Sequence, residues 1–298
     1  MFKLLKKPQK NQTLINDFCE QGYTELKNQY FSKEFYRKTY NAFDNVIELF
    51  SEDPSSNNII SNVEKDFGNH FQAIFSGAPT GYRDCRKIAT KKDQKIYFQF
   101  CKEFYSLMLE KYSEVLIKFD ILRVFFESLS TIDEKAKILF NQAIDNLEHD
   151  VSGLRDVLFR NRENLTVITR ILRYESNHQF CTSPHYDKSG LTLVLDNSDL
   201  QNDKFRIGPH MKNFDMSLLL PPNRQFDGYK NSTSTLLFPG ACLKKIGLNI
   251  NPTPHVVLPS ETRRYAIVVF CLVPHIDTKD IQTTIINKTE LSMYNREH

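Results

Sequence analysis

The pattern of hydrophobic positions changes near residue 155. Before it, long segments repeat apolar residues at helical spacing with few breakers, and after it short β-branched runs are separated by turn residues. Helices are predicted over 32–50, over 93–129 with room for one break, and over 133–151. Residues 1–155 are therefore expected to form a mostly helical region.

The first of these helical segments, "SKEFYRKTYNAFDNVIELF", shows both a start signal and a clear apolar stripe. Ser32 is a suitable N-cap, and Phe35, Phe43 and Phe50 recur on one broad face. Such an aromatic stripe could line a ligand groove, but at this spacing it is more typical of a helix–helix core. We therefore expect core packing here.

The second half of the chain, 156–298, contains five strand-like runs. These are "LTVITRILRY", "GLTLVLDN", "STLLFPG", "PHVVL" and "RRYAIVVFCLV". Pro, Gly, Asn and Ser clusters between them predict turns, and short strands at such spacing favour a barrel or a jelly-roll sandwich. The least regular stretch, 197–232, is expected to include a surface loop.

Composition excludes several function classes. The net charge of +3 is too small to indicate nucleic acid as a partner, and no apolar run approaches the length of a membrane span. The six cysteines include no Cys-x-x-Cys pair, and the start "MFKLLKKPQK" lacks the apolar stretch of a signal peptide. We therefore expect a cytoplasmic protein without membrane or nucleic-acid partners.

A candidate metal site begins at "TSPHYDKSG". On a strand, His185 and Asp187 would project from the same face because side chains alternate. One imidazole and one carboxylate are two thirds of the 2-His-1-carboxylate set that leaves open positions on non-haem Fe(II). Alone, His-x-Asp is frequent by chance, so the interpretation requires a third ligand.

His255 is the candidate for that third ligand. It is the first residue of "HVVL", which "PSET" separates from "RRYAIVVF", and this pattern predicts a hairpin. If Leu258 pairs with Arg263 across the turn, His255 and Arg264 share one face. A buried guanidinium there would require an anionic partner, for which a carboxylate is well suited.

These motifs resemble the isopenicillin N synthase-like branch of the 2-oxoglutarate/Fe(II)-dependent dioxygenases. That family has His-x-Asp, a distal His, and Arg-x-Ser beginning nine residues later, where this chain has Arg264 and Ala266. The family's Asn-x-Tyr corresponds to "LRY", which keeps Tyr174 and replaces the asparagine with Leu172. The segments "NDFCEQGYTELKNQYFSKEFYRKTY" and "GAPTGYRDCRKIATKKDQKIYFQF" resemble its N-terminal half more loosely.

The resemblance implies an α+β fold: a double-stranded β-helix (jelly roll) with the helical half packed on it. It implies Fe(II) on His185, Asp187 and His255, and 2-oxoglutarate as cosubstrate, held through its distal carboxylate by Arg264 and Tyr174. The expected reaction is oxidation, by default hydroxylation, of a small organic substrate with O2, releasing succinate and CO2.

Three alternatives stay open from the sequence. One is an oxidase of the same fold that needs no 2-oxoglutarate, which the departures at Ala266 and Leu172 make more plausible. The others are a non-catalytic jelly-roll binding protein and an interaction protein whose helical half is the working surface. The sequence indicates neither the substrate nor the oligomeric state.

Several neighbouring residues are given ordinary roles. Arg170 and Arg173 are expected to make surface contacts, and Phe270 to belong to the barrel core. The distance from His185 to His255 suggests an inserted loop around Gln201 to Tyr229, where we expect substrate selectivity to be set.

Overall fold

The structure of the chain is a computed structural model. It describes residues 13–28, 30–75, 80–87, 95–160, 163–176, 182–197, 204–222, 233–274, 276–283 and 285. The helices are α1 (Leu14–Glu20), α2 (Lys33–Glu52), α3 (Pro54–Phe75), α4 (Lys102–Lys111), α5 (Ser113–Lys118), α6 (Asp120–Glu148), α7 (Leu154–Phe159) and α8 (Ala241–Lys245). Short 3-10 turns cover η1 (Cys85–Lys87) and η2 (Met216–Leu218).

The strands form two antiparallel sheets. They are β1 (Thr24–Asn28), β2 (Gly81–Asp84), β3 (Lys95–Phe100), β4 (Val167–Tyr174), β5 (Thr182–His185), β6 (Leu191–Asn197), β7 (Phe205–Ile207), β8 (Thr233–Pro239), β9 (His255–Val257) and β10 (Arg264–Cys271). The large sheet has the order β1-β8-β6-β10-β4-β3-β2, and the small sheet has the order β5-β9-β7.

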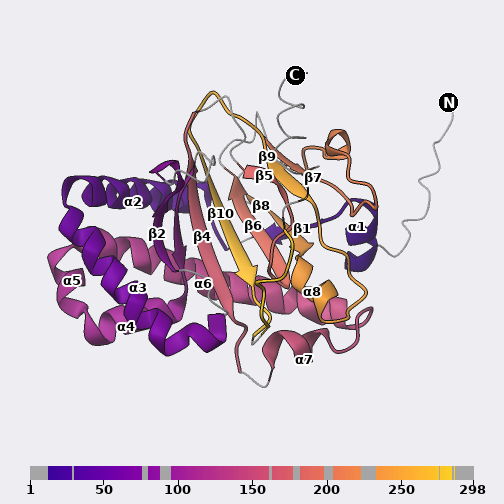
Figure 1. The fold of residues 1–298 in the computed structure, drawn as a ribbon, viewed down its shortest axis with the longest axis horizontal. Helices are drawn as coiled ribbons and strands as arrows, with labels where there is room; N and C mark the ends of the chain where they lie inside the picture. Colours follow the sequence, from indigo (N-terminus) through magenta and orange to yellow (C-terminus); the bar gives the residue numbers. More distant parts are fainter. Residues whose placement is uncertain are drawn as a thin grey trace, which may run out of the picture.

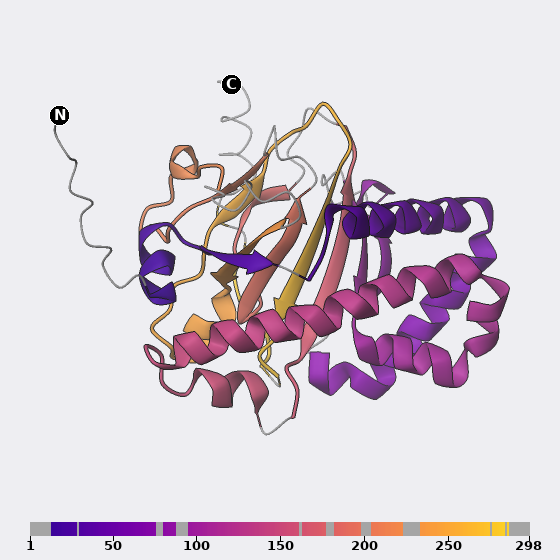
Figure 2. The same cartoon turned by 180° about the vertical axis from the view of Figure 1, so that it is seen from behind.

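Helix α6 and the small sheet lie on opposite faces of the large sheet (Figures 1 and 2). Helix α6 runs across the back of the large sheet and contacts β4 and β10, whereas α2 to α5 gather beyond the β2 edge (Figures 1 and 2). The small sheet lies at the other face, so the large sheet is the middle layer. None of the described helices combines the length and apolar character that crossing a membrane requires.

Side-chain alternation on β10 divides its residues between these two environments. Ile267, Val269 and Cys271 join the apolar core shared with the helices, whereas Ala266 joins a second cluster between the sheets. The β10–β4 register places Arg264 opposite Tyr174 and Ala266 opposite Leu172. One face of each strand therefore serves the core, and the other is available for a site.

The predicted helix starting at Ser32 is confirmed. The side chain of Ser32 accepts a hydrogen bond from the backbone N–H of Phe35 at 3.1 Å, which satisfies one donor of the first turn. The apolar stripe is core, as expected: Phe43 is fully buried and its ring stacks on Phe125 of α6.

Two helix predictions were wrong in their limits. The segment 93–129 begins with a strand, β3, whose six residues are all buried. Because both faces of this strand are covered, the apolar–polar alternation that identifies a strand is absent. The predicted gap between 129 and 133 is absent, because α6 runs unbroken from Asp120 to Glu148; α4 and α5 precede it.

Three strands that precede residue 155 take part in the large sheet. β1 pairs with β8, β3 with β4, and β2 with β3. The division of the chain into 1–155 and 156–298 stays a prediction. The sheet that faces the small sheet is nevertheless built from both sides of that boundary.

Asp133 of α6 offers a test of how this helical core is held together. Its side chain is fully buried and meets Lys137 Nζ at 2.8 Å, yet burial raises the pKa of the carboxyl to about 6. A pKa raised on folding means that the ionised carboxylate destabilises the folded protein relative to the protonated one. The free energy of unfolding therefore falls as the pH rises from the pKa of the unfolded chain through about 6. Asp133→Asn is expected to raise the free energy of unfolding by about 1–3 kcal/mol at pH 7.5.

Urea denaturation at pH 7.5 and pH 5 measures the free energy of unfolding of the wild-type protein and the variant. The stabilisation by Asp133→Asn should be smaller at pH 5. A less stable Asp133→Asn variant at pH 7.5 would show instead that the ion pair with Lys137 outweighs the desolvation of the carboxylate.

Candidate metal centre

Three side chains predicted as metal ligands converge at one edge of the space between the sheets. Ligand atoms of His185, Asp187 and His255 all lie within 4.8 Å of one another. Asp187 Oδ1 lies 3.6 Å from Nε2 of each histidine. Two imidazoles and one carboxylate converging in this way match the donor set that holds non-haem Fe(II) with open positions.

The two histidines are oriented by their own backbone neighbours. His185 Nδ1 lies 2.8 Å from the Ser183 carbonyl oxygen, and His255 Nδ1 lies 3.2 Å from the Thr253 carbonyl oxygen. A carbonyl oxygen only accepts hydrogen bonds, so each Nδ1 carries the proton and each neutral ring presents the Nε2 lone pair. That tautomer is the one a metal requires, and such outer contacts fix ligand orientation in metal sites.

Asp187 lies just beyond β5, not on the strand as the sequence predicted. Its carboxylate is held by Thr192 of β6, whose Oγ1 donates to Oδ2 at 2.8 Å. Its carbonyl oxygen accepts from the Ala241 backbone N–H at 2.8 Å, at the start of α8. The turn after β5, rather than strand alternation, therefore brings the carboxylate beside the imidazoles.

The electrostatics of this cluster favour the neutral form of His185. Burial lowers the pKa of His185 well below its ordinary value, and the neighbouring His255 lowers it further, while Asp187 acts in the opposite direction. His255 is itself only 5% exposed. Neutral imidazoles bind a metal ion without first releasing a proton.

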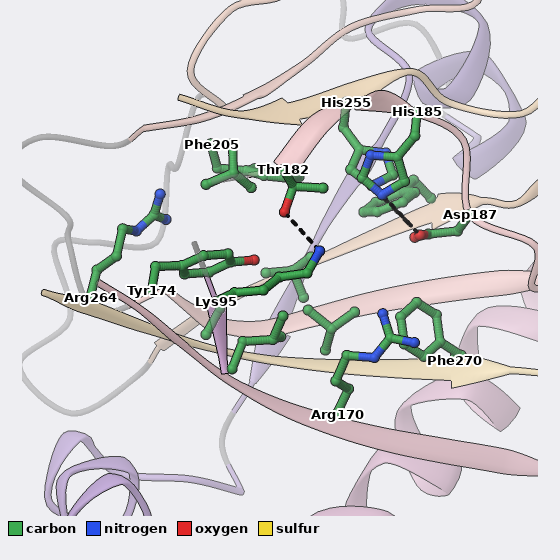
Figure 3. Close-up of a pocket in the computed structure, with 16 residues that line it drawn as sticks. Lys95, Arg170, Tyr174, Thr182, His185, Asp187, Phe205, His255, Arg264 and Phe270 are labelled. Carbon is green, nitrogen blue, oxygen red and sulfur yellow. Dashed lines mark hydrogen bonds and ion pairs between the residues drawn. The ribbon is translucent and has the colours of Figure 1, made fainter. Parts of the chain in front are cut away.

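A pocket extends from the metal centre between the two sheets (Figure 3). It holds about 560 Å³ of empty space, including open solvent at its mouth. The large sheet provides Arg264, Tyr174, Lys95 and Arg170, among others, and the small sheet provides both histidines. The pocket walls thus combine apolar residues with several cationic groups.

Arg264 and Tyr174 lie at the end of the pocket away from the metal centre (Figure 3). Arg264 is 1% exposed, and its Cζ atom lies 5.3 Å from the centroid of the Tyr174 ring. The next residue back along the chain, Arg263, points away from the pocket and contacts Glu175 at 3.2 Å.

The predicted hairpin between the strands of His255 and Arg264 was wrong. β9 pairs with β5 and β7, so His255 lies opposite His185 and Ile207, whereas β10 pairs with β4 and β6. The segment between β9 and β10 crosses from the small sheet to the large one. His255 and Arg264 do face the same pocket, but from opposite walls.

Two further expectations were wrong in the same region. Arg170 lines the pocket, and Arg173 is 8% exposed and pairs with Asp44 of α2 at 2.8 Å, so neither makes surface contacts. Phe270 also lines the pocket instead of lying wholly in the core. The expected insertion includes β7, which pairs with the strand of His255, while 201–203 and 223–229 lie outside the described residues.

Lys95 of β3 is a pocket residue that sequence reasoning missed. Its side chain is 9% exposed, and Nζ donates to Thr182 Oγ1 at 3.2 Å. In the register of the large sheet, Lys95 lies opposite Tyr174, which lies opposite Arg264. A lysine at the start of an otherwise apolar run, "KIYFQF", was the available signal, and reading that run as a helix concealed it.

Comparison with known proteins identifies the fold. No protein-family model and no curated protein sequence matches the chain. Among solved structures, it resembles the 2-oxoglutarate complex of the dioxygenase for auxin oxidation 1 from Arabidopsis thaliana (14% identity, TM-score 0.52), over 86% of this chain and 84% of that one.

Two further solved structures show the same likeness. One is a full-length Neurospora crassa protein in complex with α-ketoglutarate, that is 2-oxoglutarate, and 5-formyluracil (14% identity, TM-score 0.54; 95% of this chain, 88% of that one). The other is the rice dioxygenase for auxin oxidation (11% identity, TM-score 0.54; 95% and 87%). The chain therefore has the fold of the 2-oxoglutarate/Fe(II) oxygenases, and the resemblance predicted from its sequence is confirmed at the level of the fold.

Proposed function

We propose that the protein is a non-haem Fe(II)- and 2-oxoglutarate-dependent dioxygenase that oxidises a small organic substrate. The observation that carries the proposal is the convergence of His185, Asp187 and His255, within 4.8 Å of one another, at a pocket between two sheets. The shared fold of proteins crystallised with 2-oxoglutarate supports it.

Each residue of the centre has a definite task in this proposal. The Nε2 atoms of His185 and His255 and the carboxylate of Asp187 would hold Fe(II), with Thr192 fixing the carboxylate through its 2.8 Å hydrogen bond. Bound Fe(II) together with 2-oxoglutarate supplies the oxidation by O2, with release of succinate and CO2. Apolar walls from Phe205, Phe238 and Val257 would exclude water from the reacting atoms.

For the distal carboxylate of 2-oxoglutarate, we assign the row formed by Lys95, Tyr174 and Arg264. The three residues hold facing positions on neighbouring strands, and all three line the pocket. The Lys95 ammonium lies beside Thr182, between the Arg264 guanidinium and the histidines (Figure 3). Such donors form charge-assisted hydrogen bonds with a carboxylate. Lys95 would offset the loss of the family's serine and asparagine at Ala266 and Leu172, both of which line the pocket.

Lys95→Met tests this assignment. The dissociation constant of 2-oxoglutarate should rise roughly tenfold, which corresponds to one charge-assisted hydrogen bond. Fe(II) affinity should stay unchanged or increase, because the lysine charge already disfavours positive charge on His185. Titration calorimetry without oxygen measures both, with the exposed Lys102→Met as the control. Equal losses of Fe(II) and 2-oxoglutarate binding would indicate a structural role instead.

The proposal also covers architecture and outcome. We infer that the two facing sheets correspond to a double-stranded β-helix, with the helical residues of 1–155 packed against a core in 156–298. Hydroxylation is the outcome we assign by default. The small-molecule character of the substrate is supported by the similar Neurospora crassa protein, which was crystallised with 2-oxoglutarate and 5-formyluracil.

A second candidate is a 2-oxoglutarate-independent oxidase of the same fold, favoured by Ala266 and Leu172 in the pocket wall. Succinate formed in proportion to oxidised substrate separates the two functions. Oxygen consumption and substrate oxidation without succinate would establish the oxidase. A protein that binds no Fe(II), and whose ligand binding is unaffected by His185→Ala, would instead be a binding protein.

A further inference from the structure

Arg170 is a pocket cation that the proposed function does not use. It lies on β4 opposite Val268, whereas Tyr174 and Arg264 face each other four residues further along the strand. At ~3.3 Å per residue the two rows are roughly 13 Å apart. Arg170 is therefore outside the row assigned to the distal carboxylate of 2-oxoglutarate.

The guanidinium of Arg170 is held in a fixed orientation. Its Cζ atom lies 4.9 Å from the ring centroid of Tyr97 and 4.8 Å from that of Phe270. Both Nε and Nη2 donate to Gln99 Oε1, at 2.9 and 2.6 Å. Stacking and hydrogen bonding together select one rotamer before any ligand arrives, which lowers the entropic cost of binding.

The charge of Arg170 is not neutralised by the protein residues that the structure describes. Its hydrogen-bond partner there is the neutral amide of Gln99, and it forms no ion pair within that part of the chain. A guanidinium has five N–H donors, of which Gln99 receives two. Three donors remain for a ligand or for water, in a wall where an unpaired charge is costly.

Arg170 lies at the end of the pocket nearest to Asp187 (Figure 3). Asp187 accepts from Thr192, Thr192 lies opposite Phe270 in the β6–β10 register, and Phe270 lies against Arg170. In Figure 3, Arg170 and Phe270 occupy the end of the pocket nearest Asp187, and Arg264 occupies the far end. A molecule bound at Arg170 would thus reach the metal from a different side than one bound at Arg264.

We propose that the substrate is a small organic carboxylate whose anionic group binds Arg170 and whose apolar body lies along Phe270 and Phe238. This inference rests on the proposed function. One planar guanidinium, already stacked, matches one planar carboxylate in a bidentate pair. Fe(II), the 2-oxoglutarate dianion and Asp187 together would carry one negative charge, which Lys95 and Arg264 already offset, so the charge of Arg170 is left for a further anion.

The test compares two probes that differ in charge but hardly in shape, phenylacetate and phenylacetamide. Each is titrated by calorimetry, without oxygen, into the full-length protein loaded with Fe(II) and 2-oxoglutarate. The visible absorption of that loaded complex, recorded first, reports on the proposed function itself. If the complex forms, phenylacetate should bind at least tenfold more tightly than phenylacetamide.

Two variants tie this preference to Arg170. Arg170→Gln should weaken phenylacetate binding tenfold or more and change phenylacetamide binding less than threefold. Arg170→Lys keeps the positive charge and loses the paired donors of the guanidinium, so it should weaken phenylacetate binding severalfold. This variant replaces Arg170→Gln in the test if the glutamine variant does not fold. Arg263→Gln, on the opposite face of the neighbouring strand, is the control.

Equal affinity of the loaded wild-type protein for the two probes would overturn the proposal. So would equal weakening of both probes by either Arg170 variant, because the guanidinium would then only shape the wall. Phenyl phosphate bound tenfold more tightly than phenylacetate would overturn the assignment to a carboxylate. Failure to form the Fe(II)/2-oxoglutarate complex would instead count against the proposed function.

Discussion

Replacing Asp187 with alanine is expected to lower the affinity for Fe(II) by well over ~100-fold, since losing a group that merely orients a ligand already costs ~10–100-fold. The carboxylate lies 3.6 Å from Nε2 of both histidines and is the one negative charge of the cluster. Two neutral imidazoles would remain, and these leave the ion without charge compensation. Anaerobic titration calorimetry with Fe(II) measures the loss, and circular dichroism verifies the fold.

A graded companion variant makes this prediction specific. Thr192→Val keeps the shape of the side chain and removes the donor to Asp187 Oδ2, so Fe(II) affinity should fall about tenfold. Asp120→Ala, which removes an exposed carboxylate of α6, should leave the Fe(II) affinity unchanged. Fe(II) binding that survives Asp187→Ala would exclude this cluster as the iron site.

The second large effect is expected from Arg264→Ala. Removing the guanidinium should raise the dissociation constant of 2-oxoglutarate in the Fe(II)-loaded protein roughly 10- to 100-fold, because one or two charge-assisted hydrogen bonds are lost from a dry pocket wall. Arg264 is 1% exposed, so water compensates poorly for its absence. Fe(II) affinity should not change, since the arginine lies at the other end of the pocket (Figure 3).

Arg263→Ala is the matched control for this variant. It removes the neighbouring arginine, whose side chain is 52% exposed and faces Glu175 outside the pocket. It should leave 2-oxoglutarate binding within about twofold, since single exposed ion pairs contribute little. Unchanged 2-oxoglutarate affinity in Arg264→Ala would mean that other cations of the pocket bind the cosubstrate.

The convergence of the three candidate ligands could be predicted from the sequence because it depends on residue types and their order. His185, Asp187 and His255 are brought together as expected, although Asp187 lies beyond the end of its strand. Arg264 reaches the same pocket because β10 alternates between core and pocket faces. The alternation of side chains along a strand, which can be followed in the sequence, places Arg264 on that face.

Strand pairing and the N-terminal contribution to the pocket could not be predicted in the same way. A polar turn such as "PSET" signals that the chain reverses, but reversal within a sheet and crossing between two sheets leave the same local pattern. Lys95 was missed because a strand buried on both faces resembles a buried helix. Alternation places Arg170 on the same face of β4 as Tyr174, but that this face is a pocket wall and not the surface depends on the small sheet that lies opposite.

The central claim, that this pocket holds Fe(II) and 2-oxoglutarate together, is tested most directly by visible absorption without oxygen. Adding 2-oxoglutarate to the Fe(II)-loaded wild-type protein should produce a charge-transfer band that neither component gives alone. The band should be absent in Asp187→Ala and should require higher 2-oxoglutarate concentrations in Arg264→Ala. A wild-type protein that binds Fe(II) and shows no band at saturating 2-oxoglutarate would contradict the account.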